Sequence, residues 1–478
     1  MNPTVRPSRS RLRGAALSAL GLLAGCAVGP DYQRPSAPLP PAYKEAPAQG
    51  AAWFPAAPAD ALDKGEWWRL FGDADLDALA GQVDVSNQNV AAAVAAYAQA
   101  RALVREDRAG LFPSVGVSAS AQRGGGGSQT TTGNRFQLGA DASWAPDVWG
   151  RLGRTIEGAQ ASAQASAADL AAARLSVQGL LATNYFSVRD ADAEIALLRS
   201  TVEGYERALK ITSNRYAAGI AAKTDVLQAQ TQLASTRADL STLQGQRAQR
   251  EHAIAVLVGK APAGFTLPVA AWKMFVPAVP LGVPSTLLQR RPDIASAERA
   301  VAAANAQIGV QKSAYYPSLT LSATAGSASS GLGQLFNASN TLWSFGLAVT
   351  QTVFDAGSVA ARVEGAEAAR DAVVARYRQI VLAAFQAVED QLSQTRALAE
   401  QASLREEASQ AADLTEQQFL NRYVQGQVAY TDVVTAQATA LSARRTLAQL
   451  ASSRQATAIA LIQALGGGWH AEGAEAAR

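Results

Sequence analysis

Asn214-Arg-Tyr-Ala-Ala-Gly-Ile-Ala-Ala-Lys-Thr-Asp-Val-Leu-Gln-Ala-Gln230 recurs in diverged form as Asn421-Arg-Tyr-Val-Gln-Gly-Gln-Val-Ala-Tyr-Thr-Asp-Val-Val-Thr-Ala-Gln437. Similarity at a long fixed offset marks a duplicated structural unit. The chain is therefore predicted to be a tandem duplication, with repeat 1 at 74–259 and repeat 2 at 286–466. Further equivalent pairs are Gly150 and Gly357, Gly259 and Gly466, and Phe112-Pro113-Ser114 and Tyr316-Pro317-Ser318.

Each copy of this stretch predicts a tight turn between two helices. Gly219 and Gly426 suit the position just after a helix, and Thr224 and Thr431 suit the cap before the next one. The chain has no proline between Pro146 and Pro262 or after Pro317. Proline breaks helix interiors, so these Ala-, Gln- and Leu-rich spans are predicted to be long helices. One helix over 151–213 would be about 95 Å long.

The helices that follow the turns carry apolar or small residues at steps of three and four. This spacing is typical of helices that pack as coiled coils, and the small residues allow close approach. Each repeat is thus predicted as helix, hairpin, long helix, tight turn and helix. The repeating positions are Val226, Ala229, Leu233, Thr236, Leu240 and Leu243, then Val433, Ala436, Ala440, Ala443, Leu447 and Leu450.

Two stretches in each repeat alternate apolar with polar or small residues, which is the pattern of β-strands. A loop rich in Gly, Ser and Asn joins each pair, so one β-hairpin is predicted per repeat, at about 112–147 and 317–354. The apolar positions are Val115, Val117, Ala119, Phe136, Leu138, Ala140, Ala142, Trp144, Leu319, Leu321, Ala323, Trp343, Phe345, Leu347 and Val349.

Strands of about ten residues with one apolar face suit a transmembrane barrel, while a soluble hairpin with one buried face is the alternative. Four strands cannot close a barrel in lipid, since the smallest membrane barrels have about eight and open edges leave backbone groups unpaired. If the strands cross a membrane, several chains must share one barrel.

The N-terminal sequence predicts export of the chain and its final location. Arginines at 6, 9, 11 and 13 precede a short apolar stretch that ends at Gly25-Cys26, which predicts a secretory signal peptide over 1–25. Leu23-Ala24-Gly25-Cys26 resembles a bacterial lipobox, which implies a covalent lipid on Cys26. The alternative is an ordinary signal peptide with a chance cysteine. Ala27, rather than Asp, follows the cysteine and by the same resemblance favours the outer membrane.

Composition removes several function classes. The chain holds 42 Lys and Arg against 39 Asp and Glu, and the four signal-peptide arginines account for the excess, so no nucleic-acid partner is expected. One Cys and two distant His residues argue against disulfides, a metal site and His-based catalysis, so we expect no enzyme and no cofactor besides the lipid. The other predicted segments are a Pro-rich, lipid-anchored extended segment at 26–73, a connector at 260–285 and a tail at 467–478.

Longer motifs point to a family. Val283-Pro-Ser-Thr-Leu-Leu-Gln-Arg-Arg-Pro-Asp-Ile-Ala-Ser-Ala-Glu298, the Gly-Pro-Asp-Tyr at 29–32 and the two Asn-Arg-Tyr-x-x-Gly turns resemble the TolC-type outer-membrane efflux channels, in their lipoprotein branch. The resemblance covers essentially the whole mature chain. It implies a mainly α fold with a membrane β part. In it, a homotrimer forms one twelve-stranded transmembrane β-barrel, four strands per chain, which continues as a periplasmic α-helical coiled-coil barrel.

The function implied is that of a passive duct. An outer-membrane channel of this kind takes drugs or other small molecules from an inner-membrane pump and a periplasmic adaptor to the outside. It would be anchored by its lipid as well as by its barrel. The alternative is a periplasmic coiled-coil adaptor lipoprotein, but adaptors carry a single helical hairpin flanked by β-rich halves, so the duplication argues against that class.

The resemblance also implies a gate at the periplasmic turns. In the family, acidic residues in the second repeat's turn constrict the tunnel and Tyr and Arg partners engage them. Asp432, its repeat equivalent Asp225 and Tyr423 match such positions. The alternative for both aspartates is a negative charge at a helix start, which the helix dipole favours.

The match to the family's gate is incomplete. The second acidic position of relatives is Thr435 here, and the place where some relatives carry Arg is Val428. We therefore expect a gate that is held differently, with Arg422 or Lys223 as substitutes.

Overall fold

The structure is a computed structural model that describes residues 28–37, 40–45, 65–126, 129–272, 274–277, 279 and 290–468. The predicted signal peptide, Cys26 and nearly all of the predicted tail lie outside these residues. The chain divides into two compact units, and each combines segments of both repeats. Unit 1 draws on Met1–Ser36, Ala96–Ala167 and Ser296–Arg378, and unit 2 on Ala37–Ala95, Ala168–Ala295 and Gln379–Arg478.

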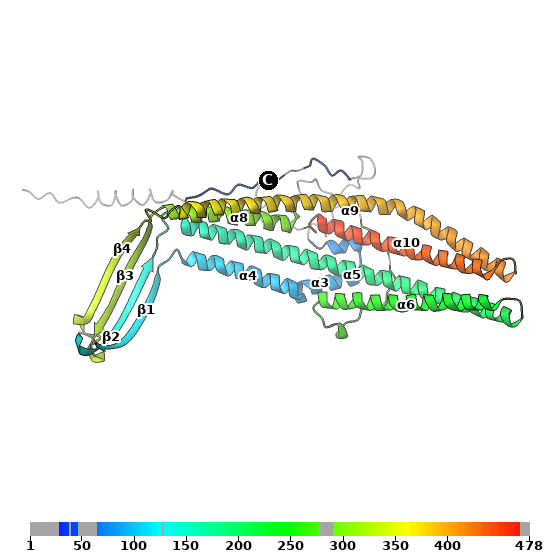
Figure 1. The fold of residues 1–478 in the computed structure, drawn as a ribbon, viewed down its shortest axis with the longest axis horizontal. Helices are drawn as coiled ribbons and strands as arrows, with labels where there is room; N and C mark the ends of the chain where they lie inside the picture. Colours follow the sequence, from blue (N-terminus) through cyan, green and yellow to red (C-terminus); the bar gives the residue numbers. More distant parts are fainter. Residues whose placement is uncertain are drawn as a thin grey trace, which may run out of the picture. The chain divides into compact units, whose positions relative to one another are not determined.

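Unit 1 carries one antiparallel sheet in the order β1-β2-β3-β4 (Figure 1). The strands are β1 (Ser114–Gly126), β2 (Gln129–Trp144), β3 (Ser318–Ser329) and β4 (Thr341–Thr350). Both predicted hairpins are confirmed. The sheet adds a pairing between β2 and β3, which joins the hairpins of the two repeats and leaves β1 and β4 as the edges of the described sheet.

The register sorts the side chains by polarity. Directly paired residues in an antiparallel sheet share a face, and Val115 pairs with Ala142, which pairs in turn with Ala323. Continued across β4, this face collects the predicted apolar positions, while the other face carries mostly Ser, Thr, Gln, Gly and Asp. Trp343 is 79% exposed and Phe345 69% exposed, so the apolar face lies open in the single chain.

Unit 1 also holds the start of the extended N-terminal segment. Gly29 has φ +111°, and a Cβ there would lie 2.5 Å from the Cα of Gly309, so only glycine fits. Asn305 donates to the Pro30 carbonyl at 2.8 Å, and Tyr32 donates to Glu298 at 2.9 Å. The Gly-Pro-Asp-Tyr motif thus attaches this segment to helix α8 (Pro292–Lys312).

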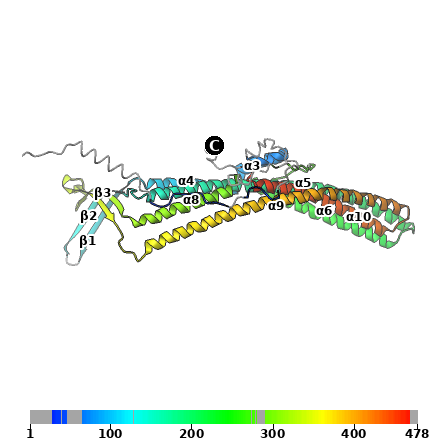
Figure 2. The same cartoon turned by 90° about the horizontal axis from the view of Figure 1, so that it is seen from above.

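Helices dominate the remainder of the chain. Helices α5 (Arg151–Ala217) and α9 (Ser358–Val424) have 67 residues each, and α6 (Lys223–Leu257) and α10 (Tyr430–Ala464) have 35 each. The equal lengths confirm the duplication and the long helices. In unit 2, α5 lies beside α6 and α9 beside α10 (Figures 1 and 2). Most of the predicted coiled-coil positions are buried, including Val226, Ala229, Leu233, Val433 and Ala440.

The first predicted helix of repeat 1 is two helices, α3 (Ala74–Ser86) and α4 (Gln88–Ala109). Asn87 divides them, because its side chain accepts from the backbone of Asn89 and Val90 and donates to the Leu257 carbonyl at 2.7 Å. The first of these interactions caps α4, and the second satisfies a carbonyl at the end of α6.

Beside α3, the 3-10 helix η1 (Trp67–Phe71) places three buried aromatic side chains against α5 in the main core of unit 2. Within the described residues, every helix lacks the long apolar stretch that a membrane-spanning helix needs.

Candidate gate at the helical turns

The two predicted turns have the same backbone geometry. Gly219 has φ +75° and Gly426 has φ +78°, which a residue with a Cβ rarely adopts. The amide of Ile220 donates to the Arg215 carbonyl at 2.8 Å, and that of Gln427 donates to the Arg422 carbonyl at 2.9 Å. These bonds satisfy carbonyls at the helix ends, so the role predicted for both glycines is confirmed.

The predicted caps of the following helices are wrong by two residues. Ala222 and Ala429 hold the cap positions without a side-chain hydrogen bond, and Thr224 and Thr431 are already helical. Each cap residue is extended, with ψ near 155°, and the helix begins at the next residue, one position before the Thr.

This start places Asp225 and Asp432 in the first turn of α6 and α10. Unpaired helix N–H groups favour negative charge at such positions, so the geometry fits the simple helix-start role of both aspartates. Asp432 is exposed, and Asp225 is half-buried. The exposed carboxylate remains available for a second role.

Tyr423 lies inside the turn region rather than on its surface. It is 4% exposed and packs with Tyr430, Val433 and Ala229, so its cluster joins the end of α9 to the starts of α10 and α6. The rings of Tyr423 and Tyr430 are 5.1 Å apart. Burial raises the pKa of Tyr430 to about 12. The Tyr423 hydroxyl is buried, and among the described residues it has no hydrogen-bond partner.

Arg215 is the cation that reaches across the turns. From the end of α5 it donates to the Val424 carbonyl at 3.1 Å, and its guanidinium lies 4.9 Å from the centre of the Tyr423 ring. It thereby caps the last turn of α9 and stacks on the buried tyrosine. Its Nε is buried and, within the described chain, has no hydrogen-bond partner.

The predicted substitutes occupy other places. Lys223 lies 5.3 Å above the ring of Tyr216 within its own repeat, and Arg422 is exposed at the end of α9. Within the described chain the cation that contacts the other turn is Arg215, the repeat equivalent of Arg422, and the roles expected for Arg422 and Lys223 stay predictions. The repeated Asn-Arg-Tyr motif marks both arginines and gives no sign of which one crosses.

A pocket of about 250 Å³ lies between α9 and α10 and includes two of the predicted residues, Asp432 and Thr435. The Thr435 hydroxyl donates to the Thr431 carbonyl of its own helix at 2.9 Å. The Thr435 hydroxyl is therefore engaged within its own helix, and its predicted role at the gate stays a prediction. The other lining residues are Ala412, Thr415, Phe419, Ala436 and Thr439.

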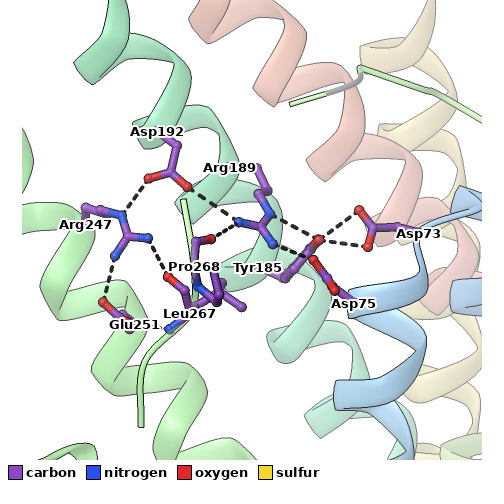
Figure 3. A network of polar contacts seen from close by, with 9 residues as sticks. All are labelled: Asp73, Asp75, Tyr185, Arg189, Asp192, Arg247, Glu251, Leu267 and Pro268. Carbon is purple, nitrogen blue, oxygen red and sulfur yellow. Dashed lines mark hydrogen bonds and ion pairs between the residues drawn. The ribbon is translucent and has the colours of Figure 1, made fainter. Parts of the chain in front are cut away.

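A second polar cluster, away from the turns, centres on Arg189 (Figure 3). This side chain is 3% exposed and donates to the Pro268 carbonyl at 2.6 Å, to Asp75 at 2.9 Å and to the Tyr185 hydroxyl at 3.1 Å. Tyr185 donates in turn to both carboxylate oxygens of Asp73, at 2.7 and 2.8 Å. Burial and the adjacent Asp73 raise the pKa of Tyr185.

The same cluster continues to α6. Arg247 donates to Asp192 at 2.6 Å, to Glu251 at 2.7 Å and to the Leu267 carbonyl at 2.8 Å (Figure 3). The buried Arg189 and the half-buried Arg247 thus fasten the described part of the predicted connector to α5 and α6. We interpret this cluster as a structural joint, since every group in it holds backbone or another charge.

Nothing in the described chain groups three or more His, Cys, Asp or Glu side chains in a way that could hold a metal ion. The described residues of the turns offer the exposed carboxylate of Asp432, the half-buried carboxylate of Asp225, aromatic packing and the Arg215 cation.

Comparisons with known proteins add to this geometry. The sequence profile of the family described as "Outer membrane efflux protein" matches residues 79–260 and 283–467, which closely follow the two predicted repeats.

Individual relatives match along almost their whole length. The chain is 31% identical over 452 residues to the cation efflux system protein CusC of Escherichia coli, which covers 94% of this chain and 96% of CusC. It is 31% identical over 469 residues to TtgC of Pseudomonas putida, a probable efflux pump outer membrane protein, covering 95% of both chains. The solved structure of the outer-membrane channel OprN has a TM-score of 0.82 at 31% identity and covers 93% of this chain and 100% of its own.

Proposed function

The chain belongs to the outer membrane efflux protein family, and on this premise we propose that it works as a homotrimeric, passive duct of a tripartite export system. The predictions of an outer-membrane efflux channel and of its mainly helical, duplicated fold are confirmed. The relatives are named as outer-membrane channels or efflux proteins, which gives the adaptor alternative no support.

The observation that supports the trimer best is the sheet itself. It has a continuous apolar face and two edge strands, and an edge in lipid leaves backbone groups without partners. Three copies supply twelve strands, an even number within the range of closed membrane barrels. The duct takes its substrates from an inner-membrane pump and a periplasmic adaptor and performs no catalysis of its own.

Oligomeric state tests this proposal. Native mass spectrometry in mild detergent is expected to show three chains, and a stable monomer would contradict it. Arg introduced at Leu138 or Leu347 is expected to impair assembly more than Arg at Gln137 or Thr350, because only the first two lie on the apolar face.

Substrate class is a coarser inference. CusC is named for cation efflux and other relatives are named for toluene, solvent or antibiotic efflux, so the family spans unlike cargoes. We assign drugs or other small molecules to this chain as a class, with the pump rather than the duct choosing among them. Transport assays in a strain that lacks its own channel, supplied with this chain and a chosen pump, would test the assignment.

Lipid attachment at Cys26 completes the proposed anchoring. The lipobox-like Leu23-Ala24-Gly25-Cys26 and the absence of any other cysteine in the sequence support it. Intact-mass analysis is expected to show residues 1–25 removed and Cys26 acylated. An unmodified Cys26, or retention of 1–25, would contradict it. Cys26→Ser is expected to lose the lipid and still trimerise through the barrel.

We assign the periplasmic gate to the two turns. In a trimer each Asp432 occurs three times around the axis, and Asp225 can add three more carboxylates. An acidic ring attracts cations and binds multivalent ones. Asp432→Asn is expected to weaken cation preference and multivalent-cation block in planar-bilayer recordings, and Asp225→Asn to do so less. If selectivity and block stay unchanged in Asp432→Asn, the aspartate serves only the helix start.

A further inference from the structure

The ten residue pairs of the second hairpin each have an equivalent pair in the first hairpin. Val115 pairs with Ala142 in the first hairpin, and Leu319 pairs with Val349 in the second. These pairs are related by offsets of 204 residues between β1 and β3 and 207 residues between β2 and β4. The offset of 204 also relates the sequence Phe112-Pro113-Ser114 to its copy.

Side-chain contacts obey the same two offsets. The Trp144 indole donates to the Leu111 carbonyl at 2.9 Å, and the Gln351 amide donates to the Tyr315 carbonyl at 3.2 Å. The side chains differ chemically, yet each reaches the equivalent carbonyl. The hydroxyl-to-carbonyl contacts of the other equivalent pair are both 3.3 Å, Ser114 to Ser143 and Ser318 to Thr350. The hairpins are thus related by an internal symmetry that extends to individual atoms.

The junction between the hairpins shows how one repeat meets the next. Strand β2 pairs with β3 through nine residue pairs, from Phe136 opposite Ser329 to Trp144 opposite Leu321. In a closed barrel of several copies, the only other junction of this kind joins β4 of one copy to β1 of the next. Adding 207 to each β2 residue number and subtracting 204 from each β3 residue number gives the expected residue pairs between β4 and β1 of the next copy.

We propose that β4 pairs antiparallel with β1 of a second copy in this transferred register, from Trp343 opposite Gly125 to Gln351 opposite Val117. The proposal rests on the proposed homotrimer and specifies its subunit contact. In the single chain Gln351 lies one residue beyond the end of β4, whereas its equivalent Trp144 is still the last residue of β2. The second copy extends the strand to that residue.

The register satisfies the polarity of both strands. Each odd-numbered residue of β4 meets an odd-numbered residue of β1, so Val349 faces Ala119 and the apolar face continues across the subunit boundary. A shift by one residue would turn one strand's apolar face to the polar side. Phe345, 69% exposed in the single chain, faces Arg123 of the second copy, where the guanidinium can lie over the ring.

Cysteine crosslinking tests the register directly. Ala348 and Ser120 of the second copy are opposite in the proposed ladder, and both are small residues on the polar face. The Ala348→Cys, Ser120→Cys double variant is expected to form interchain disulfides on mild oxidation. Combining Ala348→Cys with Ser118→Cys or Gln122→Cys shifts the pair by two residues, beyond the reach of a disulfide, and is expected to give several-fold less product.

An intrachain pair serves as the matched reference. Asp141 and Thr324 face each other in the described sheet and are the internal equivalents of the test pair. The Asp141→Cys, Thr324→Cys variant fixes how well this geometry crosslinks, because the internal symmetry gives both pairs the same surroundings in the ladder. Single-cysteine variants control for Cys26.

Each outcome decides the question. Crosslinking that is strongest with Ser120→Cys, at a yield like that of the reference pair, supports the register. A maximum at either shifted position, or no interchain product from a protein that native mass spectrometry shows to be trimeric, overturns the register and leaves the trimer standing. A monomeric protein would instead overturn the proposed function.

Discussion

Arg189 and Arg215 lie on the same helix, α5, and hold their surroundings in opposite ways. Arg189 is almost fully buried and donates to a carbonyl, a carboxylate and a hydroxyl. It also forms an ion pair with Asp192, with 3.5 Å between the nitrogen and the carboxylate oxygen. Arg215 donates one hydrogen bond to a carbonyl and lies over one aromatic ring, and its Nε has no hydrogen-bond partner in the described chain.

We expect this difference to separate a rigid region around Arg189 from a region at the turns that can move. Around Arg189 many interactions must break together, so this region is expected to keep one arrangement. At the turns few interactions hold the helix ends, and segments that move in gating come from such low-stability regions. Arg215 makes one hydrogen bond and one ring contact, against three hydrogen bonds and an ion pair for Arg189, so we expect the turns to be the less constrained of the two regions.

The largest expected effect breaks the joint. Arg189→Met removes a buried cation from the Pro268 carbonyl, the Tyr185 hydroxyl and the buried Asp192, and is expected to cost about 3–5 kcal/mol of unfolding free energy, as for other broken buried pairs. Arg237→Met is the control, because Arg237 is 57% exposed and its pair with Glu206 is expected to be worth under about 1 kcal/mol. Denaturant unfolding of the trimer measures both. Equal losses would remove the distinction.

Removing one hydroxyl from each region, in Tyr185→Phe and in Tyr423→Phe, compares how strongly each hydroxyl stabilises the fold. Tyr185→Phe removes hydrogen bonds with Asp73 and Arg189 and is expected to cost about 1.5–3 kcal/mol, the range for bonds to charged groups. Tyr423→Phe removes a buried hydroxyl without a partner and is expected to be neutral or stabilising. Thermal unfolding of both variants tests this, and a larger loss from Tyr423→Phe would contradict it.

The smallest expected effect is a dependence on pH. Burial raises the pKa of Asp190 from 3.8 to about 6, with a smaller contribution from Glu194, while a hydrogen bond from Ser452 and the charge of Arg250 act against it. The folded chain therefore favours the protonated carboxyl. Its contribution to stability is complete below pH 3.8 and is lost as the pH rises through 6. Asp190→Asn is expected to flatten this part of the profile of unfolding midpoint against pH, and an unchanged profile would refute the assignment.

Local sequence patterns predict the long helices, the hairpins and the turns because each depends on neighbouring residues. The long proline-free spans permit 67-residue helices, and Gly219 and Gly426 end them as expected. Alternation along the strands predicts which side chains share a face, and the observed register agrees.

Local sequence patterns do not predict interactions between residues that are far apart in the sequence. Arg189 and Asp75 are 114 residues apart, and nothing near either one indicates the other. Arg215 and Arg422 occupy equivalent places in one motif, so only the packing of α5 against α9 decides which becomes the bridge. The sequence favours Thr224 and Thr431 as caps because of their side chains, but each helix begins one residue before the Thr.

Single-channel recording of the trimer in planar bilayers tests most directly the gate that we propose at the turns, through the expectation that the Arg215 bridge restrains them. Arg215→Met removes the bridge to Val424 and Tyr423, while Arg422→Met makes the same change at the equivalent exposed position. The account predicts that Arg215→Met raises the fraction of time that the channel is open and that Arg422→Met leaves it as in the parent. Equal effects of the two substitutions, or no effect of Arg215→Met, would contradict it.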